Sequence, residues 1–192
     1  MTALAALGRR VRLGLVGGGA GAMIGPVHRA AARLDDVIEI SAGVLSSDPG
    51  RSLAEAARLG IPRGYADVPA MLAGEAGRAD GVDAVAIMTP NDSHGPVTMA
   101  ALAAGRHVIC DKPLSNDLAE ARRIVAAVDA SGLVFCLTHN YSGYPMVRHA
   151  RQMVRDGALG EIRVVQVEYP QDWLTEALEK TGGILSDPDP NW

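Results

Sequence analysis

Cysteine is nearly absent from the 192-residue chain. The two cysteines, Cys110 and Cys136, each lie inside an apolar run that is typical of a buried strand. Two such residues exclude a disulfide framework and favour inert thiols in a reducing compartment. Cys136 and His139 would supply half of a metal site, but the sequence offers no second pair of ligands. We therefore expect no bound metal.

Lysine is equally rare, because Lys112 and Lys180 are the only two and the arginines are dispersed. With a formal net charge of −4, the chain lacks the cationic face that nucleic-acid binding requires. The longest uncharged run, Leu13 to Val27, is too short and too rich in glycine to span a bilayer. Arg9-Arg10 before it resembles a twin-arginine export signal, but no convincing cleavage site follows. We expect a cytoplasmic protein without nucleic-acid or membrane partners.

Aromatic residues are few and unevenly placed. The chain has one phenylalanine, two tryptophans and four tyrosines, and most of them lie in the last third: Tyr141, Tyr144, Tyr169, Trp173 and Trp192. The composition therefore changes near residue 140. The length agrees with such a change, because it exceeds one dinucleotide-binding domain and falls short of that domain plus a full partner.

The first 138 residues alternate between apolar, strand-like runs and segments of helical periodicity, which is typical of βαβ units on a parallel sheet. The predicted strands are Val11–Val16, Val37–Leu45, a short piece near Tyr65, Asp83–Met88, His107–Cys110 and Leu133–Thr138. The predicted helices begin near Pro26, Pro49, Asp67 and Ser93, and a long helix to Ser131 begins after candidate N-caps at Ser115 to Asp117. This pattern predicts an α/β fold, a doubly wound parallel Rossmann sheet over residues 10–138.

The pattern after residue 138 is different. A helix is predicted over about Tyr144 to Arg155, and Glu161 to Tyr169 alternates as a half-exposed strand does. No further strand pattern follows. We expect residues 139–192 to form a hinge helix and the first strand of an incomplete second α/β domain.

A cluster of glycines follows the first predicted strand and precedes a helix. Gly17, Gly19 and Gly21 let the backbone approach a pyrophosphate closely, and the helix N-terminus supplies N–H donors. The third glycine of G-x-G-x-x-G falls on Ala22, and Ala20 lies within the same loop. The alternative is a flexible loop without a ligand. The placement between strand and helix favours dinucleotide binding.

The end of the second predicted strand indicates which dinucleotide binds. A carboxylate at this tip accepts hydrogen bonds from the ribose hydroxyls of NAD, whereas here Ser46 and Ser47 are followed by Arg51. Two hydroxyls and an arginine suit a 2′-phosphate, which favours NADP over NAD. Asp48 leaves two alternatives open, a ribose contact or a turn that caps the next helix.

Two further polar segments follow strands at the same predicted edge of the sheet. Thr89-Pro90-Asn91 and His94 follow the fourth strand, and Asp111-Lys112-Pro113 follows the fifth. A lysine here can hydrogen-bond a substrate hydroxyl or assist proton transfer. The alternative is a solvated lysine in a helix-initiating turn.

Together these motifs resemble the Gfo/Idh/MocA family of NAD(P)-dependent oxidoreductases, named for glucose–fructose oxidoreductase and inositol dehydrogenase. The matching segments are TPNDSH at 89–94, AGRHVICDKP at 104–113 and GALGEIRVV at 157–165. The resemblance implies that the glycine loop binds the pyrophosphate and that Thr89, Pro90, Asn91 and His94 line the ribose and nicotinamide side. It also implies that Lys112 is the active-site lysine, with Asp111 beside the cofactor in place of the family's glutamate. Asn140 and Tyr141 lie where relatives approach substrate, and Trp173 is a further expected substrate contact.

The resemblance implies an oxidoreductase that transfers a hydride between a nicotinamide cofactor and a sugar or polyol, such as an inositol. A full-length form is expected to be a homo-oligomer. Relatives carry an acid/base histidine in a D-x-x-x-H segment of a C-terminal domain, and the sequence stops at Trp192 before such a segment. The alternative is a non-catalytic dinucleotide-binding module or an inactive truncated fragment. A third possibility is reduction of an imine or another unsaturated substrate.

Overall fold

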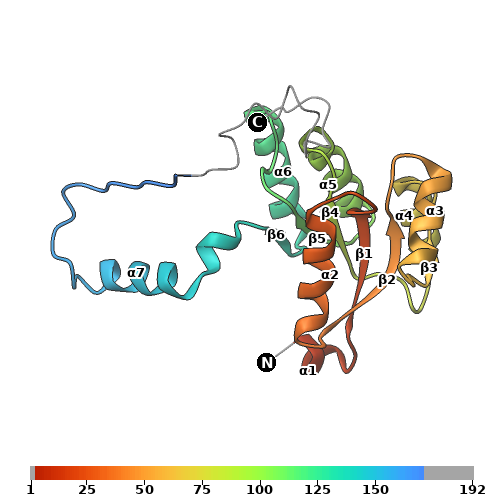
Figure 1. Cartoon of the computed structure of the whole chain (residues 1–192), viewed down its shortest axis with the longest axis horizontal. Helices are drawn as coiled ribbons and strands as arrows, with labels where there is room; N and C mark the ends of the chain where they lie inside the picture. Colours follow the sequence, from red (N-terminus) through yellow and green to blue (C-terminus); the bar gives the residue numbers. More distant parts are fainter. Residues whose placement is uncertain (1–2, 171–192) are drawn as a thin grey trace. The chain divides into compact units, whose positions relative to one another are not determined.

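The computed structural model describes residues 3–170 (Figure 1). Its strands are β1 (Val11–Gly17), β2 (Ile38–Val44), β3 (Arg63–Gly64), β4 (Ala84–Met88), β5 (His107–Cys110) and β6 (Phe135–Leu137). Its helices are α1 (Ala3–Leu7), α2 (Ile24–Leu34), α3 (Pro49–Arg58), α4 (Val68–Glu75), α5 (His94–Ala103), α6 (Leu118–Ser131) and α7 (Pro145–Arg155). Two short 3₁₀ turns cover Asn91–Ser93 and Asn140–Gly143.

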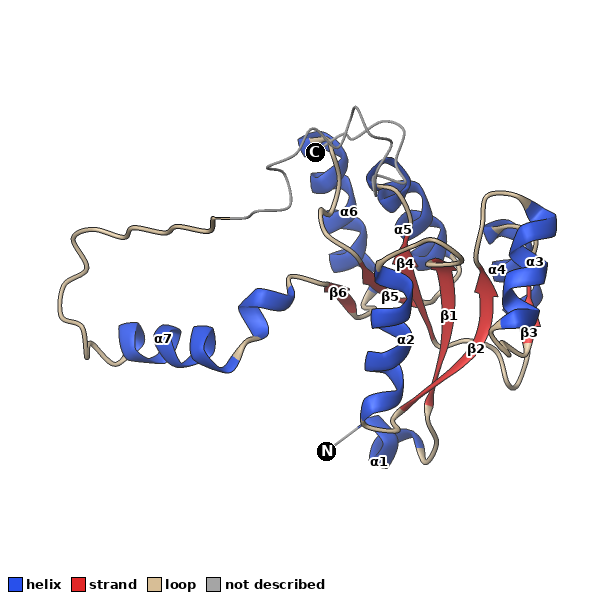
Figure 2. Cartoon of the chain, in the orientation of Figure 1, coloured by secondary structure: helices blue, strands red, loops and turns tan. Residues whose placement is uncertain are grey.

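The six strands form one sheet in the order β3-β2-β1-β4-β5-β6, and every pair is parallel (Figure 2). The chain leaves β1 toward β2 and β3, then returns to the other side of β1 with β4. This reversal is the topological switch point of a doubly wound sheet. The predicted Rossmann fold is therefore confirmed.

Helices cover both faces of the sheet, and alternate strand residues face different helices. Leu13 and Leu15 of β1 belong to one hydrophobic cluster, together with Ala32 of α2 and Ala56 of α3. Val16, one residue further along β1, belongs to another cluster on the opposite face. That cluster includes buried or partly buried side chains of α4, α5 and α6: Met71, Leu72, Ala101, Leu102, Ala127 and Val128. Burial on both faces explains why β4 is apolar throughout.

The chain divides into two compact units, Met1–Thr138 and a second that begins at His139. In the second unit, α7 lies within the helix predicted over residues 144–155. The predicted strand Glu161–Tyr169 is not formed, because this segment pairs with no strand in the described range. A strand requires a hydrogen-bonded neighbour, and alternation alone does not supply one. Ile162, Val164 and Tyr169 are exposed.

The two arginines that resemble an export signal take part in ion pairs of the folded structure. Arg9 donates to both carboxylate oxygens of Asp83, at 2.6 and 2.9 Å, and Arg10 pairs with Asp36. The backbone N–H of Arg12 also donates to Asp83. Among residues 3–170, no helix is long and apolar enough to span a membrane.

A buried carboxylate ties α4 to β3 on one side of the first unit. Glu75 is fully buried and accepts hydrogen bonds from Arg63 at 2.6 and 2.8 Å and from Tyr65 at 2.7 Å. The backbone N–H of Val82 donates to it as well. Burial by itself would raise the pKa of Glu75, but the hydrogen bonds from Arg63 and Tyr65 outweigh it, and the pKa is lowered.

Replacing this carboxylate is expected to destabilise the first unit. Glu75→Gln leaves the Arg63 guanidinium without its main counter-charge and should lower the free energy of unfolding by about 3 kcal/mol at pH 7. Because the pKa is lowered in the folded state, the contribution of the ionised pair is present at neutral pH. It is lost as the pH falls through that lowered pKa.

Urea denaturation of both proteins at several pH values measures this difference. The difference in the free energy of unfolding between the wild type and Glu75→Gln should become smaller at acidic pH. Glu55→Gln is the matched control, because Glu55 pairs with the exposed Arg58 and should change stability little. Equal effects of the two substitutions would contradict the role of the buried network.

Candidate functional site

Gly19 in the loop between β1 and α2 and Gly25 in the first turn of α2 lie too close to neighbouring backbone to carry a side chain. A Cβ atom at Gly25 would collide with the backbone of Gly18, and one at Gly19 would collide with the carbonyl oxygen of Leu45 after β2. Gly18 also has a positive φ of 73°. Gly19 was recognised from the motif, whereas the roles of Gly18 and Gly25 were missed because close backbone contacts leave no spacing signal.

The N-terminus of α2 has donors that no side chain caps. α2 begins at Ile24, two residues before the predicted start at Pro26, and its N-cap Met23 makes no side-chain capping bond. Arg29 of the same helix donates to the carbonyl oxygen of Gly18 at 2.8 Å and holds the loop against the helix. A glycine loop ahead of an uncapped helix N-terminus fits a pyrophosphate.

The tip of β2 presents hydroxyls and an arginine. Asp48 caps α3 by accepting a hydrogen bond from the Arg51 backbone N–H at 2.7 Å, so its carboxylate serves the helix. Ser46 Oγ accepts from the Asp48 N–H. The exposed side chains of Ser47 and Arg51 make no hydrogen bond or ion pair with any residue of the described chain. The capping-turn alternative is thus observed for Asp48, and it leaves the Arg51 guanidinium available.

The segment after β4 lies beside the glycine loop. Gly17 pairs with Met88 in the sheet, and a Cβ atom on Gly17 would meet the Thr89 side chain at 3.1 Å. The Thr89 hydroxyl is buried and has no hydrogen-bond partner among the described atoms. An unpaired hydroxyl here fits a ligand that brings its own polar groups. Pro90 is exposed and Asn91 is partly exposed, in the turn that leads to α5.

His94 is buried at the first position of α5. Its Nδ1 lies 2.7 Å from the carbonyl oxygen of Pro113, and its Nε2 lies 2.9 Å from the carbonyl oxygen of Thr89. The ring therefore connects the turn after β4 with the turn after β5. A contact of His94 with the cofactor stays a prediction.

Asp111 is held by two residues that lie far away in the sequence. His28 of α2 contacts Asp111 Oδ1 through Nε2 at 2.9 Å, and the Thr138 hydroxyl donates to the same oxygen at 2.7 Å. Burial would raise the pKa of Asp111, but the hydrogen bonds from His28 and Thr138 outweigh it, so the pKa is lowered. Neither His28 nor Thr138 was singled out from the sequence. The only feature of the sequence that could have identified them is that both lie near the same predicted edge of the sheet.

Lys112 is exposed, and its side chain makes no hydrogen bond or ion pair with the described residues. The Lys112–Pro113 peptide bond is cis. The ammonium is therefore free to contact a ligand at the carboxyl edge of the sheet.

The predicted cofactor residues all lie at the carboxyl ends of the strands or in the segments that follow them. They end β1 or follow β1, β2, β4 and β5: Gly17, Gly19, Ala20, Gly21, Ala22, Ser46, Ser47, Arg51, Thr89, Pro90, Asn91, His94, Asp111 and Lys112. Residues 3–170 contain no group of three or more side chains suited to a metal.

The predicted substrate residues all lie after residue 138 in the sequence. Asn140 and Tyr141 form the 3₁₀ turn before α7, and Trp173 lies outside the described residues. The Tyr141 ring packs edge-on against Tyr144 and Tyr169, with centroids 5.3 and 5.6 Å apart. Tyr141, Tyr144 and Tyr169 thus form an aromatic cluster within the second unit.

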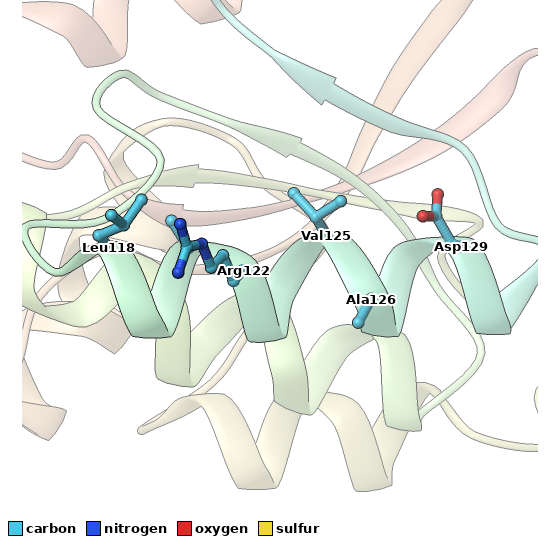
Figure 3. Close-up of a pocket in the computed structure, with 6 residues that line it drawn as sticks. Leu118, Arg122, Val125, Ala126 and Asp129 are labelled. Atoms are coloured by element: carbon cyan, nitrogen blue, oxygen red, sulfur yellow. The ribbon is translucent and has the colours of Figure 1, made fainter.

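A shallow hollow of about 360 Å³ follows the outer surface of α6 (Figure 3). It is lined by one helix alone: Leu118, Ala121, Arg122, Val125, Ala126 and Asp129. None of these residues follows a strand, and none was predicted to bind cofactor or substrate. The hollow is separate from the candidate site.

Comparison with known proteins gives the family. The model of the oxidoreductase family with an NAD-binding Rossmann fold, GFO_IDH_MocA, matches residues 11–139. The chain is 37% identical over 166 residues to the uncharacterized oxidoreductase YfiI of Bacillus subtilis, covering 85% of this chain and 42% of that protein. It is 32% identical to 1,5-anhydro-D-fructose reductase of Ensifer adhaerens, covering 75% of this chain and 44% of the relative.

Solved structures agree. An oxidoreductase from Sinorhizobium meliloti is 53% identical with a TM-score of 0.82, covering 86% of this chain and 47% of that one. An inositol dehydrogenase homolog from Azotobacter vinelandii, complexed with NADH and myo-inositol, is 40% identical with a TM-score of 0.76. The match covers 81% of this chain and 41% of that one. The chain thus spans less than half the length of these relatives. The resemblance drawn from the motifs is confirmed: the chain belongs to the Gfo/Idh/MocA family of oxidoreductases, with an NAD-binding Rossmann fold.

Proposed function

We propose that this chain is the cofactor-binding part of an NAD(P)-dependent oxidoreductase that acts on a sugar or polyol. The observation that carries the proposal is the convergence, in a member of this family, of the glycine loop and Lys112 at one edge of the sheet. In open α/β sheets, ligands bind at this edge beside the switch point. The relatives named for inositol and anhydrofructose support the substrate class.

The cofactor's nicotinamide supplies the hydride donor or acceptor when it is bound. The glycine loop and the first N–H groups of α2 would hold the pyrophosphate, because the loop is rich in glycine and the N-cap Met23 makes no side-chain bond to the helix N-terminus. The unpaired Thr89 hydroxyl and Asn91 bind on the ribose and nicotinamide side. Asp111, ionised and fixed by His28 and Thr138, would accept hydrogen bonds from the cofactor.

Lys112 acts on the substrate. Its ammonium donates a hydrogen bond to the reacting hydroxyl or carbonyl oxygen, orients the substrate and favours negative charge on that oxygen. Asn140, Tyr141 and Trp173 remain the proposed substrate contacts. A polyol suits these residues, because the Asn140 amide and the Tyr141 hydroxyl can form hydrogen bonds with its hydroxyl groups.

NADP is the proposed cofactor in preference to NAD. Asp48 caps α3, so the carboxylate nearest the tip of β2 is already used. Ser46, Ser47 and the free Arg51 guanidinium suit the 2′-phosphate that distinguishes NADPH from NADH.

Titration of the protein with NADPH and with NADH, followed by the fluorescence of the reduced nicotinamide, tests the cofactor. NADPH should bind more tightly than NADH. Arg51→Ala should weaken NADPH binding about tenfold, which is the loss of one charge-assisted hydrogen bond, and should leave NADH binding unchanged. Arg58→Ala is the control on the same helix, since Arg58 pairs with Glu55. Tighter binding of NADH, insensitive to Arg51→Ala, would contradict the preference.

Assays of the intact protein with a polyol panel that includes myo-inositol test the reaction. Lys112→Met removes the ammonium and should lower kcat about 100-fold or more while the Kd for NADPH changes little. Arg122→Met on α6 is the control and should leave turnover unchanged. Unaltered turnover in Lys112→Met would contradict the role of the lysine. Cofactor binding without turnover of any polyol by the wild type would favour the non-catalytic binding module.

A further inference from the structure

The turn that carries Lys112 is hydrogen-bonded on both sides of the lysine. We call Asp111, Lys112 and Pro113 the lysine turn. On the N-terminal side, the Asp111 carboxylate is bound by His28 and by Thr138. On the C-terminal side, the carbonyl oxygen of Pro113 is in contact with His94 at 2.7 Å. Each neighbour of the lysine is therefore attached to a different histidine.

The two histidines approach from opposite faces of the sheet. His28 belongs to α2, which packs with Ala32 against one face, and His94 begins α5, which packs with Ala101 against the other. The contacts of the lysine turn and of His94 also reach the ends of two different strands. His94 contacts Thr89 after β4, and Thr138 follows β6. The lysine turn is thus cross-linked to the segments after both strands that flank β5.

Lys112 itself makes none of these contacts. Its side chain is a flexible four-carbon stem without a hydrogen-bond partner in the described structure, so its ammonium is positioned only through the backbone. A group that must meet a reacting oxygen within about 0.5 Å depends on the rigidity of the segment from which it starts. Hydrogen bonds to the residues on either side of the lysine provide that rigidity.

We propose that His28 and His94 are positioning residues that fix the backbone of Lys112 from opposite faces of the sheet. The inference deepens the proposed function, because the value of a fixed lysine rests on its role beside the substrate. The order of the lysine turn is nevertheless measurable without substrate or cofactor. Failure of the proposed reaction and failure of this inference are therefore distinguishable.

Two amide side chains separate positioning from general support of the fold. Asparagine places its amide near the Nδ1 position of histidine, and glutamine places its amide near the Nε2 position. His28 contacts Asp111 through Nε2, whereas His94 contacts Pro113 through Nδ1. The amide that preserves the contact is therefore glutamine at position 28 and asparagine at position 94. His28→Gln and His94→Asn keep a donor toward the lysine turn, and His28→Asn and His94→Gln remove it.

The scarcity of lysine makes the measurement direct. Protein labelled with ¹⁵N only at lysine gives two backbone amide signals, from Lys112 and Lys180, and Lys112→Arg assigns them. Relaxation of the Lys112 amide should report a rigid backbone in the wild type, with an order parameter of about 0.85. His28→Gln and His94→Asn should retain it, whereas His28→Asn and His94→Gln should lower it toward about 0.6.

Thermal unfolding of each variant is the parallel measurement. If the histidines only support the fold, the loss of thermal stability and of the Lys112 order parameter should depend only on which histidine is replaced. The asparagine and glutamine variants at one position should then behave alike. Thr138→Val keeps the shape of the side chain and removes the second donor to Asp111, so it should lower the order parameter even if substitutions at the buried His94 fail to fold. An unchanged Lys112 signal in His28→Asn and Thr138→Val, or identical signals for the two amides at position 28, would overturn the proposal.

Discussion

The parallel pairing of β1 with β4 is the constraint on which the site depends. β4 follows β2 and β3 in the chain, yet it pairs with the opposite side of β1, in a register that sets Gly17 against Met88. The glycine loop and Thr89 therefore leave the sheet side by side. β5 pairs with β4 in turn and carries Lys112 to the same edge. A one-residue slip in either pairing would turn these side chains to the wrong face.

Much of this fold can be read from the sequence, because strands buried on both faces must be apolar throughout. β4 and β5 have the bounds expected within a residue, and the helix caps Asp48 and Asp117 bond the N–H groups that their positions predict. The alternation over Glu161–Tyr169 predicted a strand that is not formed, because a strand also requires a hydrogen-bonded neighbouring strand. Periodicity describes which side chains seek burial and does not show what covers them.

The contacts that organise the candidate site are of a different kind. His28 and Asp111 lie 83 positions apart and carry no spacing signal, so only the folded sheet brings them together. The same holds for Glu75. Nothing in the sequence indicates that this helical carboxylate is fully buried and bound by Arg63 and Tyr65. The sequence motifs predicted the cofactor-binding residues. The residues that hold those residues in place required the structure.

The central claim is that the edge formed by β1, β4 and β5 holds a dinucleotide. Amide shifts in ¹H–¹⁵N spectra, recorded during addition of NADPH to the protein, test it most directly. The account predicts the largest changes in the glycine loop from Gly17 to Ala22, at Thr89 and Asn91, and at Lys112. Changes centred instead on the α6 hollow around Val125, or no changes at all, would contradict it.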